Sequence, residues 1–278
     1  LCKILLCKIY VNVPRFLEQE FLASKISQSL ISYILIIYSV SNKCICQKKE
    51  IIMRIRYKKW ARPELEACKF YIDNPEELKT KWQEFFKKKQ PIHMELGCGK
   101  GSFIAELASS NLNINYIAVD MVDAMLGLSK RNIEKAYMEK KIETDNIILT
   151  RHDIERILLF MSKEDEVERI YINFCNPWPK PKHKKKRLTH TKQLMLYREF
   201  LKDSGEIYFK TDDDGLFNDS LKYFAEAGFD VINKTYDLHE ENIFDNNIET
   251  EHEKMYTEEG KKIKALIARK IPNFVLDS

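Results

Sequence analysis

Two carboxylates flank a glycine-rich turn between residues 92 and 120. An apolar run, 92–96, carries Glu95 and leads into a turn with glycine at positions 97, 99 and 101; a second apolar run, 116–119, ends in Asp120. Glycines allow backbone to approach a ligand closely, and the helix that follows turns its free N–H groups toward that ligand. An acid at the end of the second strand is placed to accept hydrogen bonds from ribose hydroxyls. The stretch therefore predicts a nucleoside-binding α/β unit with contacts from Glu95, Gly97, Gly99, Gly101 and Asp120.

The spacing of these residues favours S-adenosylmethionine over a dinucleotide. The glycines follow G-x-G-x-G and are preceded by an acid, whereas a dinucleotide site expects G-x-G-x-x-G and a helix end kept clear for pyrophosphate. S-adenosylmethionine has no phosphate but carries a sulfonium and an ammonium, which tolerate a nearby carboxylate. The alternative is a glycine turn in an ordinary α/β protein that binds nothing.

Two further groups are expected at the same rim, because ligands of α/β sheets bind at the carboxyl ends of the strands. Asp153 follows a predicted strand, 146–150, and it can also cap a helix over 154–161. A fourth predicted strand, 169–174, leads into Cys175-Asn176-Pro177-Trp178-Pro179. The prolines stiffen this loop, and Trp178 offers a flat face on which a base can stack.

A basic run follows this loop. Six of the eight residues from Lys180 to Arg187 are lysine or arginine. Such a run is usually a solvated surface, but beside a rigid aromatic loop at a cofactor rim it favours contact with phosphates. We therefore expect a nucleic acid as partner.

The elements that position these groups alternate along the chain. Helices are expected after the glycine turn, over 123–140, over 191–201 and from Asp214 to Ala227, and another should begin at Pro75 with an apolar stripe of Leu78, Trp82 and Phe85. A strand over 206–210 ends in Thr211-Asp212, and the last strands, near 229–236 and 263–268, are joined by a long polar loop. In that loop Thr250 and Glu253 have the spacing of a capping box.

Composition limits the remaining possibilities. The chain has 278 residues, 44% hydrophobic content and a net charge of +4, enough for one large domain or one domain with an appendage. Its seven cysteines form no C-x-x-C pair, which indicates free thiols in a reducing cytoplasm. The six histidines lack ligand spacing, so no metal is expected.

Residues 1–52 differ from the rest. Their apolar part, 30–40, is shorter than the roughly 20 residues that span a bilayer, and no small-residue cleavage site follows it. No membrane association is expected. Met53 begins a basic, aromatic stretch, so we interpret residues 1–52 as an appendage outside the native fold and residues 53–278 as the functional domain.

Taken together, the chain from about Met53 to Ala268 resembles the bacterial tRNA guanine-N7 methyltransferases. The resemblance rests on five sequence blocks: MRIRYKKW, ELGCGKG, NFCNPWPKPKHKKKRL, IYFKTDDDGLF and NIETEHE. The third and fifth blocks are specific to that family. The resemblance implies a Rossmann-like class I methyltransferase fold, with seven mostly parallel strands, the last one antiparallel, and helices on both faces. It also implies S-adenosylmethionine as methyl donor and a variable-loop guanosine of tRNA as acceptor.

The resemblance also implies roles for individual residues. Those that correspond to cofactor contacts are Glu95, Asp120, Asp153 and Asn176. Those that correspond to substrate contacts are Lys180, Asp212, Thr250, Glu251, His252 and Glu253. The position before Pro-Trp-Pro is also the proposed active-site residue; it is Asp in many members of the family and Asn176 here. An essential carboxylate at this position is therefore not expected, and Asp212, Glu251 or Glu253 is left to supply the negative field.

Two other functions remain open from the sequence. An amine methyltransferase acting on adenine N6 or a glutamine amide usually has the loop (D/N)-P-P-(Y/F/W), and Asn176-Pro177-Trp178-Pro179 lacks the paired prolines. A tRNA-binding subunit with weakened catalysis is the other alternative, since Asn replaces Asp. The sequence does not distinguish a monomer from a homodimer.

Overall fold

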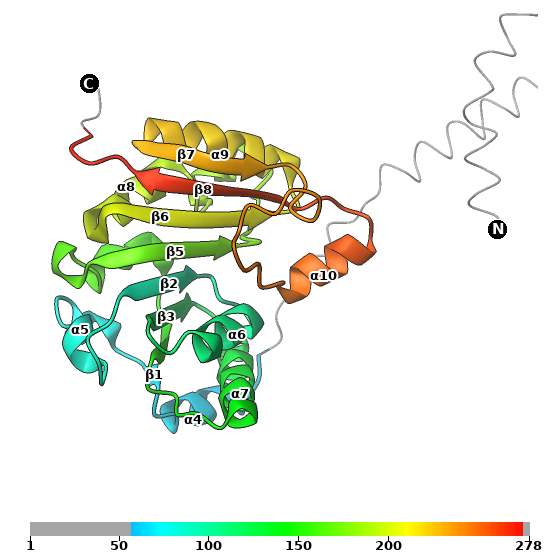
Figure 1. The fold of residues 1–278 in the computed structure, drawn as a ribbon. Helices are drawn as coiled ribbons and strands as arrows, with labels where there is room; N and C mark the ends of the chain where they lie inside the picture. Colours follow the sequence, from blue (N-terminus) through cyan, green and yellow to red (C-terminus); the bar gives the residue numbers. More distant parts are fainter. Residues whose placement is uncertain (1–56, 275–278) are drawn as a thin grey trace, which may run out of the picture. The chain divides into compact units, whose positions relative to one another are not determined.

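Short apolar runs form one eight-stranded sheet in the computed structural model, which describes residues 57–274 (Figure 1). The strands in chain order are β1 (Tyr71–Ile72), β2 (Ile92–Leu96), β3 (Asn115–Asp120), β4 (Ile147–Arg151), β5 (Val167–Asn173), β6 (Leu201–Thr211), β7 (Phe229–Thr235) and β8 (Lys264–Lys270). The expectation for residues 1–52 lies outside the described residues, so the boundary at Met53 stays a prediction.

The strand order across the sheet is β1-β4-β3-β2-β5-β6-β8-β7. All neighbouring strands are parallel except β8, which pairs antiparallel with β6 and with β7. The predicted mostly parallel sheet with an antiparallel last strand is confirmed. The expected number of seven strands is wrong by one, because the two-residue strand β1 adds to the edge beside β4.

Helices cover both faces of the sheet. The α-helices are α4 (Ala61–Glu66), α5 (Trp82–Phe85), α6 (Ser102–Ser110), α7 (Asp123–Lys140), α8 (Thr191–Phe200), α9 (Asp214–Glu226) and α10 (Glu251–Glu258). The 3₁₀ helices are η1 (Pro75–Leu78), η2 (Ile154–Leu159), η3 (Lys163–Asp165) and η4 (Pro181–Lys186). Figure 1 shows α6 and α7 in front of the sheet and α8 and α9 behind it. None of the described helices has the length and apolar character needed for a membrane crossing.

The alternation of side chains in β2 determines where Glu95 points. Ile92, Met94 and Leu96 are fully buried and pack in the cluster that contains residues of α8 and α9. His93 and Glu95 therefore project to the opposite face, because successive side chains of a strand alternate. Glu95 is one residue from the carboxyl end of β2, which brings its carboxylate to the ligand rim of the sheet.

The helix predicted from Pro75 is broken in two. Thr80 has a φ of 70° between η1 and α5, and its backbone N–H donates to Asp165 Oδ2 at 3.2 Å. Trp82 is fully buried in the core and donates through Nε1 to the Phe160 carbonyl at 2.8 Å, because a buried indole N–H needs an acceptor. Phe85 is 45% exposed, so its assignment to the apolar stripe is wrong.

Candidate active site

The glycine turn begins directly after β2. Backbone N–H groups of Gly97 and Cys98 donate to the Val119 carbonyl at 2.9 and 3.0 Å, which ties the turn to the end of β3. Gly99 and Gly101 have φ values of 54° and 70°, in the left-handed region that favours glycine. The turn thus leaves its backbone facing a cavity of about 430 Å³ at the carboxyl ends of the strands.

Glu95 is a buried carboxylate with one oxygen left without a partner. Its side chain is 2% exposed, and Oε1 accepts a hydrogen bond from Asn173 Nδ2 at 3.0 Å. Oε2 is buried and has no hydrogen-bond partner among the described residues. Burial raises the pKa of Glu95 to about 8, although Asn173 and the charge of Lys210 oppose the shift. A buried carboxylate oxygen beside a cavity is suited to a cationic ligand group.

Asp120 ends β3 and lines the same cavity. Its Oδ2 accepts from the Gly99 backbone N–H at 3.0 Å, and Oδ1 accepts from the Val122 N–H at 2.9 Å. Burial raises the pKa of this carboxyl, while the backbone hydrogen bonds act against that shift. The glycine turn and Asp120 therefore hold each other in place at the rim.

Most of the residues predicted for the site meet at this cavity. Those that line it are Glu95, Gly97, Gly99, Gly101, Asp120, Asn176, Thr250, Glu251 and His252. The lining does not include Asp153, Lys180, Asp212 or Glu253. Asp153 instead caps η2, where Oδ1 accepts from the Glu155 N–H at 3.0 Å, so the predicted capping role is confirmed.

The Asn176 loop is held by a buried arginine, Arg187, the last residue of the basic run. Arg187 is 3% exposed; it donates through Nε to the Pro177 carbonyl at 2.6 Å and through Nη1 to Asp219 Oδ2 at 2.6 Å. Asn176 Oδ1 accepts from the Trp178 N–H at 3.0 Å, which closes the loop locally. Trp178 lines the cavity, so an aromatic face does border the site.

Not every cation of the basic run is available to a partner. Lys184 Nζ lies 2.7 Å from Asp219 Oδ2, so this lysine, like Arg187, is already paired. The lysines of the run that make no ion pair with any described residue are Lys180, Lys182, Lys185 and Lys186. All four are exposed, and Lys186 Nζ lies 5.3 Å from the centre of the Trp178 ring.

Asp212 lies at the end of β6, outside the cavity beside Glu95. It lines a separate hollow of about 530 Å³ together with Lys261 and Lys264. Lys261 Nζ is 3.9 Å from Asp212 Oδ2, and Lys264 Nζ donates to the Asp212 carbonyl at 3.0 Å. Burial raises the pKa of the Asp212 carboxyl, and the two lysines oppose the shift. The surrounding lysines hold Asp212 at the rim but offset part of its charge.

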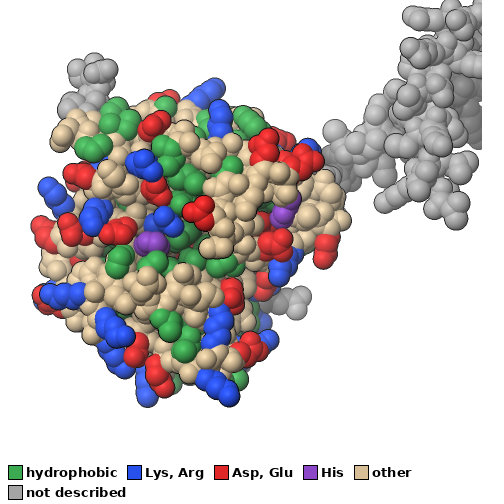
Figure 2. Space-filling view, viewed as in Figure 1, with side chains coloured by type: hydrophobic (Ala, Val, Ile, Leu, Met, Phe, Trp, Pro, Cys, Tyr) green, Lys and Arg blue, Asp and Glu red, His purple; other side chains and the backbone are tan. Residues whose placement is uncertain are grey.

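Residues 250–253 form the start of α10. Thr250 Oγ1 accepts from the Glu253 N–H at 3.0 Å, and the predicted capping box is confirmed. Glu251 pairs with Lys100 of the glycine turn at 2.7 Å, which brings α10 beside the cavity. Figure 2 shows acidic side chains gathered over α10 and the loop before it. Glu253 is fully buried and pairs with Lys210 of β6, which is not among the residues predicted for the site.

The described residues contain no group of three or more His, Cys, Asp or Glu side chains arranged to hold a metal ion. The three described cysteines, Cys68, Cys98 and Cys175, are all free thiols. The groups at the cavity are carboxylates, amides, backbone N–H groups, hydroxyls, one indole, one imidazole and the ammonium groups of Lys100 and Lys186. Within this set, the buried carboxylate of Glu95 is the group suited to a ligand atom that carries positive charge.

Comparison with known proteins identifies the family. A family model described as a putative methyltransferase matches residues 89–266. A tRNA (guanine-N(7)-)-methyltransferase of Clostridium beijerinckii is 61% identical over 218 residues, which cover 78% of this chain and 99% of that protein. Proteins of the same name from Clostridium botulinum and Clostridium perfringens are 60% and 56% identical, over 78% and 79% of this chain and 99% and 100% of their own length. The chain therefore belongs to the tRNA (guanine-N(7)-)-methyltransferase family.

Proposed function

We propose that this protein transfers a methyl group from S-adenosylmethionine to N7 of a guanosine in tRNA. The observation that carries the proposal is the unpaired, buried Oε2 of Glu95, which lies beside a glycine turn that Asp120 holds at the rim. This oxygen fits the ammonium of the donor, and Asp120 fits its ribose hydroxyls. The names of the relatives support tRNA as substrate. We also propose that the protein acts in the cytoplasm, which its free thiols support.

Methyl transfer to guanine N7 requires no acid–base catalysis by the side chains. When bound, the donor supplies a sulfonium methyl group for in-line displacement. Guanine N7 carries a lone pair and no proton, so no general base is required. The task of Asn176 and Trp178 is then to align the guanine and exclude water. Negative charge for the methylated ring would come from Asp212, because Lys100 already pairs with Glu251 and Lys210 with Glu253.

The direct test is methylation of unmodified tRNA by the purified full-length protein with radiolabelled donor, followed by nucleoside analysis. We expect 7-methylguanosine as the product. N6-methyladenosine would favour the amine-directed alternative. Binding of tRNA without any methylated product would favour the RNA-binding subunit.

Asn176 and Asp212 are expected to respond differently to substitution. Asn176→Asp should retain activity, because either side chain can hold the donor or the guanine edge and no base is needed. Asp212→Ala should lose most of the activity, about tenfold or more, since electrostatic stabilisation of developing charge is lost. Initial rates of radiolabelled methyl transfer measure both variants. Full activity of Asp212→Ala would contradict the role proposed for this carboxylate.

RNA binding should depend steeply on salt. N7 lies in the major groove, which is too narrow for side chains in an A-form helix, so the target must be an accessible guanosine of folded RNA. The triple variant Lys180→Ala/Lys182→Ala/Lys185→Ala should bind tRNA more weakly, and its slope of log K against log salt should fall by about 2 to 3. Filter binding at several salt concentrations gives this slope.

The control for this experiment is a triple alanine variant of Lys81, Lys88 and Lys89. These lysines are exposed and precede β2, at the opposite end of the strand from the glycine turn. This control variant loses the same three positive charges, but its salt slope should change far less than that of the Lys180/Lys182/Lys185 variant. Equal slopes for the two variants would mean that the run 180–187 makes no specific phosphate contact.

A further inference from the structure

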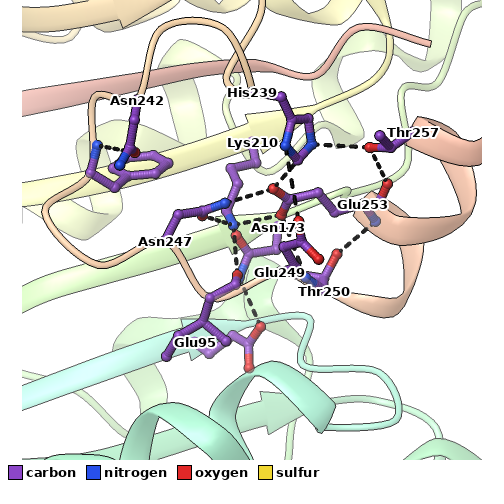
Figure 3. Close-up of polar contacts among 12 residues, drawn as sticks. Glu95, Asn173, Lys210, His239, Asn242, Asn247, Glu249, Thr250, Glu253 and Thr257 are labelled. Atoms are coloured by element: carbon purple, nitrogen blue, oxygen red, sulfur yellow. Dashed lines mark hydrogen bonds and ion pairs between the residues drawn. The ribbon is translucent and has the colours of Figure 1, made fainter. Parts of the chain in front are cut away.

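Lys210 is a buried cation with three hydrogen-bond partners in one neighbouring segment. It projects from β6 and is 4% exposed. Its Nζ donates to Glu253 Oε2 at 2.8 Å, to Asn247 Oδ1 at 2.8 Å and to the Ile248 carbonyl at 3.0 Å (Figure 3). An ammonium has three donors, so every N–H of Lys210 is used.

Glu253 is satisfied entirely from inside the protein. It is fully buried; Oε1 accepts from Asn247 Nδ2 at 2.8 Å, and Oε2 accepts from Lys210 and from the Thr250 backbone N–H. Both oxygens of this carboxylate are buried and hydrogen-bonded within the protein, so they cannot contact RNA directly. The substrate role that the family resemblance implies for Glu253 must therefore act through other residues.

Those other residues belong to the segment that the ion pair holds. Thr250, Glu251 and His252 all line the cavity beside the glycine turn. The segment 236–250 contains no helix or strand, so no ladder of backbone hydrogen bonds fixes its position. Two hydrogen bonds of Lys210, to Asn247 and to the Ile248 carbonyl, anchor this segment to the sheet, and the third holds Glu253 of α10.

The same lysine also lies beside the cofactor side of the site. Figure 3 shows the Lys210 ammonium between Glu253 and the Glu95–Asn173 pair. Asn173 donates to Glu95 Oε1, and the charge of Lys210 acts to lower the pKa of Glu95. One buried cation thus faces both the carboxylate proposed for the donor and the segment that borders the acceptor.

We propose that Lys210 is a positioning residue for methyl transfer, whose buried ion pair with Glu253 fixes the segment 247–252 against the cofactor cavity. The proposal rests on the proposed function for its kinetic consequences, but not for its structural ones. Removing one partner of a buried pair leaves the other charge uncompensated, so the segment should move in order to solvate it. A misplacement of about 1 Å is enough to reduce catalysis by roughly 100-fold.

The test is a double-mutant cycle of Lys210→Met, Glu253→Gln and the double variant. Hydrogen exchange of residues 247–253 reports the position of the segment without any need for activity. In Lys210→Met we expect lost protection there and a kcat/KM for tRNA about 100-fold lower. Binding of S-adenosylhomocysteine should weaken at pH 7, because loss of the Lys210 charge raises the pKa of Glu95, and it should recover at higher pH, because Glu95 and Asp120 remain. In the double variant the second substitution should lower kcat/KM only slightly further, as expected for two residues that act as one unit.

Two further variants keep the result interpretable. Asn247→Ala removes a shared hydrogen-bond partner without leaving a buried charge unpaired, so it should fold and show a smaller loss of the same kind. Arg198→Met is the matched control: Arg198 is a buried cation that donates to the carbonyls of Gly228 and Ile271, before β7 and after β8. It should lower thermal stability but leave the protection of 247–253 and kcat/KM unchanged at temperatures where the protein is folded.

Normal protection of 247–253 in Lys210→Met, or fully additive losses in the cycle, would overturn the proposal. If the unmodified protein fails to methylate tRNA, the proposed function fails instead. Hydrogen exchange would still decide whether Lys210 holds the segment.

Discussion

Glu95→Gln is expected to weaken binding of S-adenosylmethionine by about 100-fold or more. Glutamine has the same shape and can still accept the hydrogen bond of Asn173. It places an N–H₂ group where the unpaired Oε2 now lies, however, and that group would face the ammonium of the donor. A hydrogen bond to a charged group contributes about 1.5–3 kcal/mol, and a buried donor left unsatisfied adds a similar cost. Titration calorimetry with the donor and with S-adenosylhomocysteine measures the loss.

The same carboxyl makes donor binding depend on pH. Burial raises the pKa of Glu95 to about 8, so in the free protein at pH 7 the group is mostly protonated. The ionised form accepts the ammonium, so affinity should fall by about tenfold per pH unit below 8. Calorimetry at pH 6, 7 and 8.5 should show this fall in the native protein and its absence in Glu95→Gln. Parallel curves for the two proteins would assign the dependence to another group.

The same pKa shift makes folding stability depend on pH in the opposite direction from donor binding. Because the folded pKa of Glu95 lies above its ordinary value of 4.5, the folded protein holds a proton that the unfolded chain releases between pH 4.5 and 8. The stability that this group contributes is complete below pH 4.5 and is lost as the pH rises through 8. A bound ammonium compensates for this loss, since it stabilises the ionised carboxylate.

Local patterns predicted the glycine turn and its acids correctly, because each depends on a few neighbouring residues. The apolar run of β2, the glycines and Asp120 at the end of β3 lie within 29 residues, and parallel pairing of the two strands brings them together. The capping roles of Asp153 and Thr250 are equally local, and both were predicted.

Pairings between distant residues were not predicted. The basic run predicts Arg187 as one of six phosphate-binding cations, but Asp219, 32 residues away, holds it inside the protein. Thr80, which breaks the expected helix, is bound by Asp165, 85 residues away. Nothing near either residue in the sequence shows that such a partner will be present.

Lys210 did have a signal in the sequence. It is the one charged residue in Ile207-Tyr208-Phe209-Lys210, the apolar stretch near the end of β6. A lysine buried in a sheet requires an acidic partner, because an isolated buried ammonium is too costly. The sequence could thus have predicted that a buried acid exists, but not which of the many acidic residues it is.

Alanine substitution should reduce stability by very different amounts at two glycines of the turn, Gly101 and Gly99. A Cβ on Gly101 would lie 2.0 Å from Ser129 Oγ and 2.9 Å from Ser129 Cα, and that Cα belongs to the backbone of α7. Backbone cannot rotate away as a side chain can, so α6 and α7 must separate. Overpacking costs about 1–3 kcal/mol, and the left-handed φ of 70° adds about 1–2 kcal/mol. Gly101→Ala should therefore lose about 2–5 kcal/mol of unfolding free energy, a large share of the 5–15 kcal/mol typical of a domain.

Gly99→Ala is the matched comparison, because the same substitution two residues earlier meets no atom within 4 Å. Only its φ of 54° carries a cost, about 1–2 kcal/mol, so the variant should stay folded. Gly99 lines the cofactor cavity, however, and the added methyl group would occupy space proposed for the donor. Urea unfolding should thus separate the two variants in stability, while calorimetry should find weakened donor binding in Gly99→Ala despite its intact fold. Equal stability losses would mean that α7 does not press on the turn, and normal donor binding by Gly99→Ala would mean that the donor does not approach the turn at this residue.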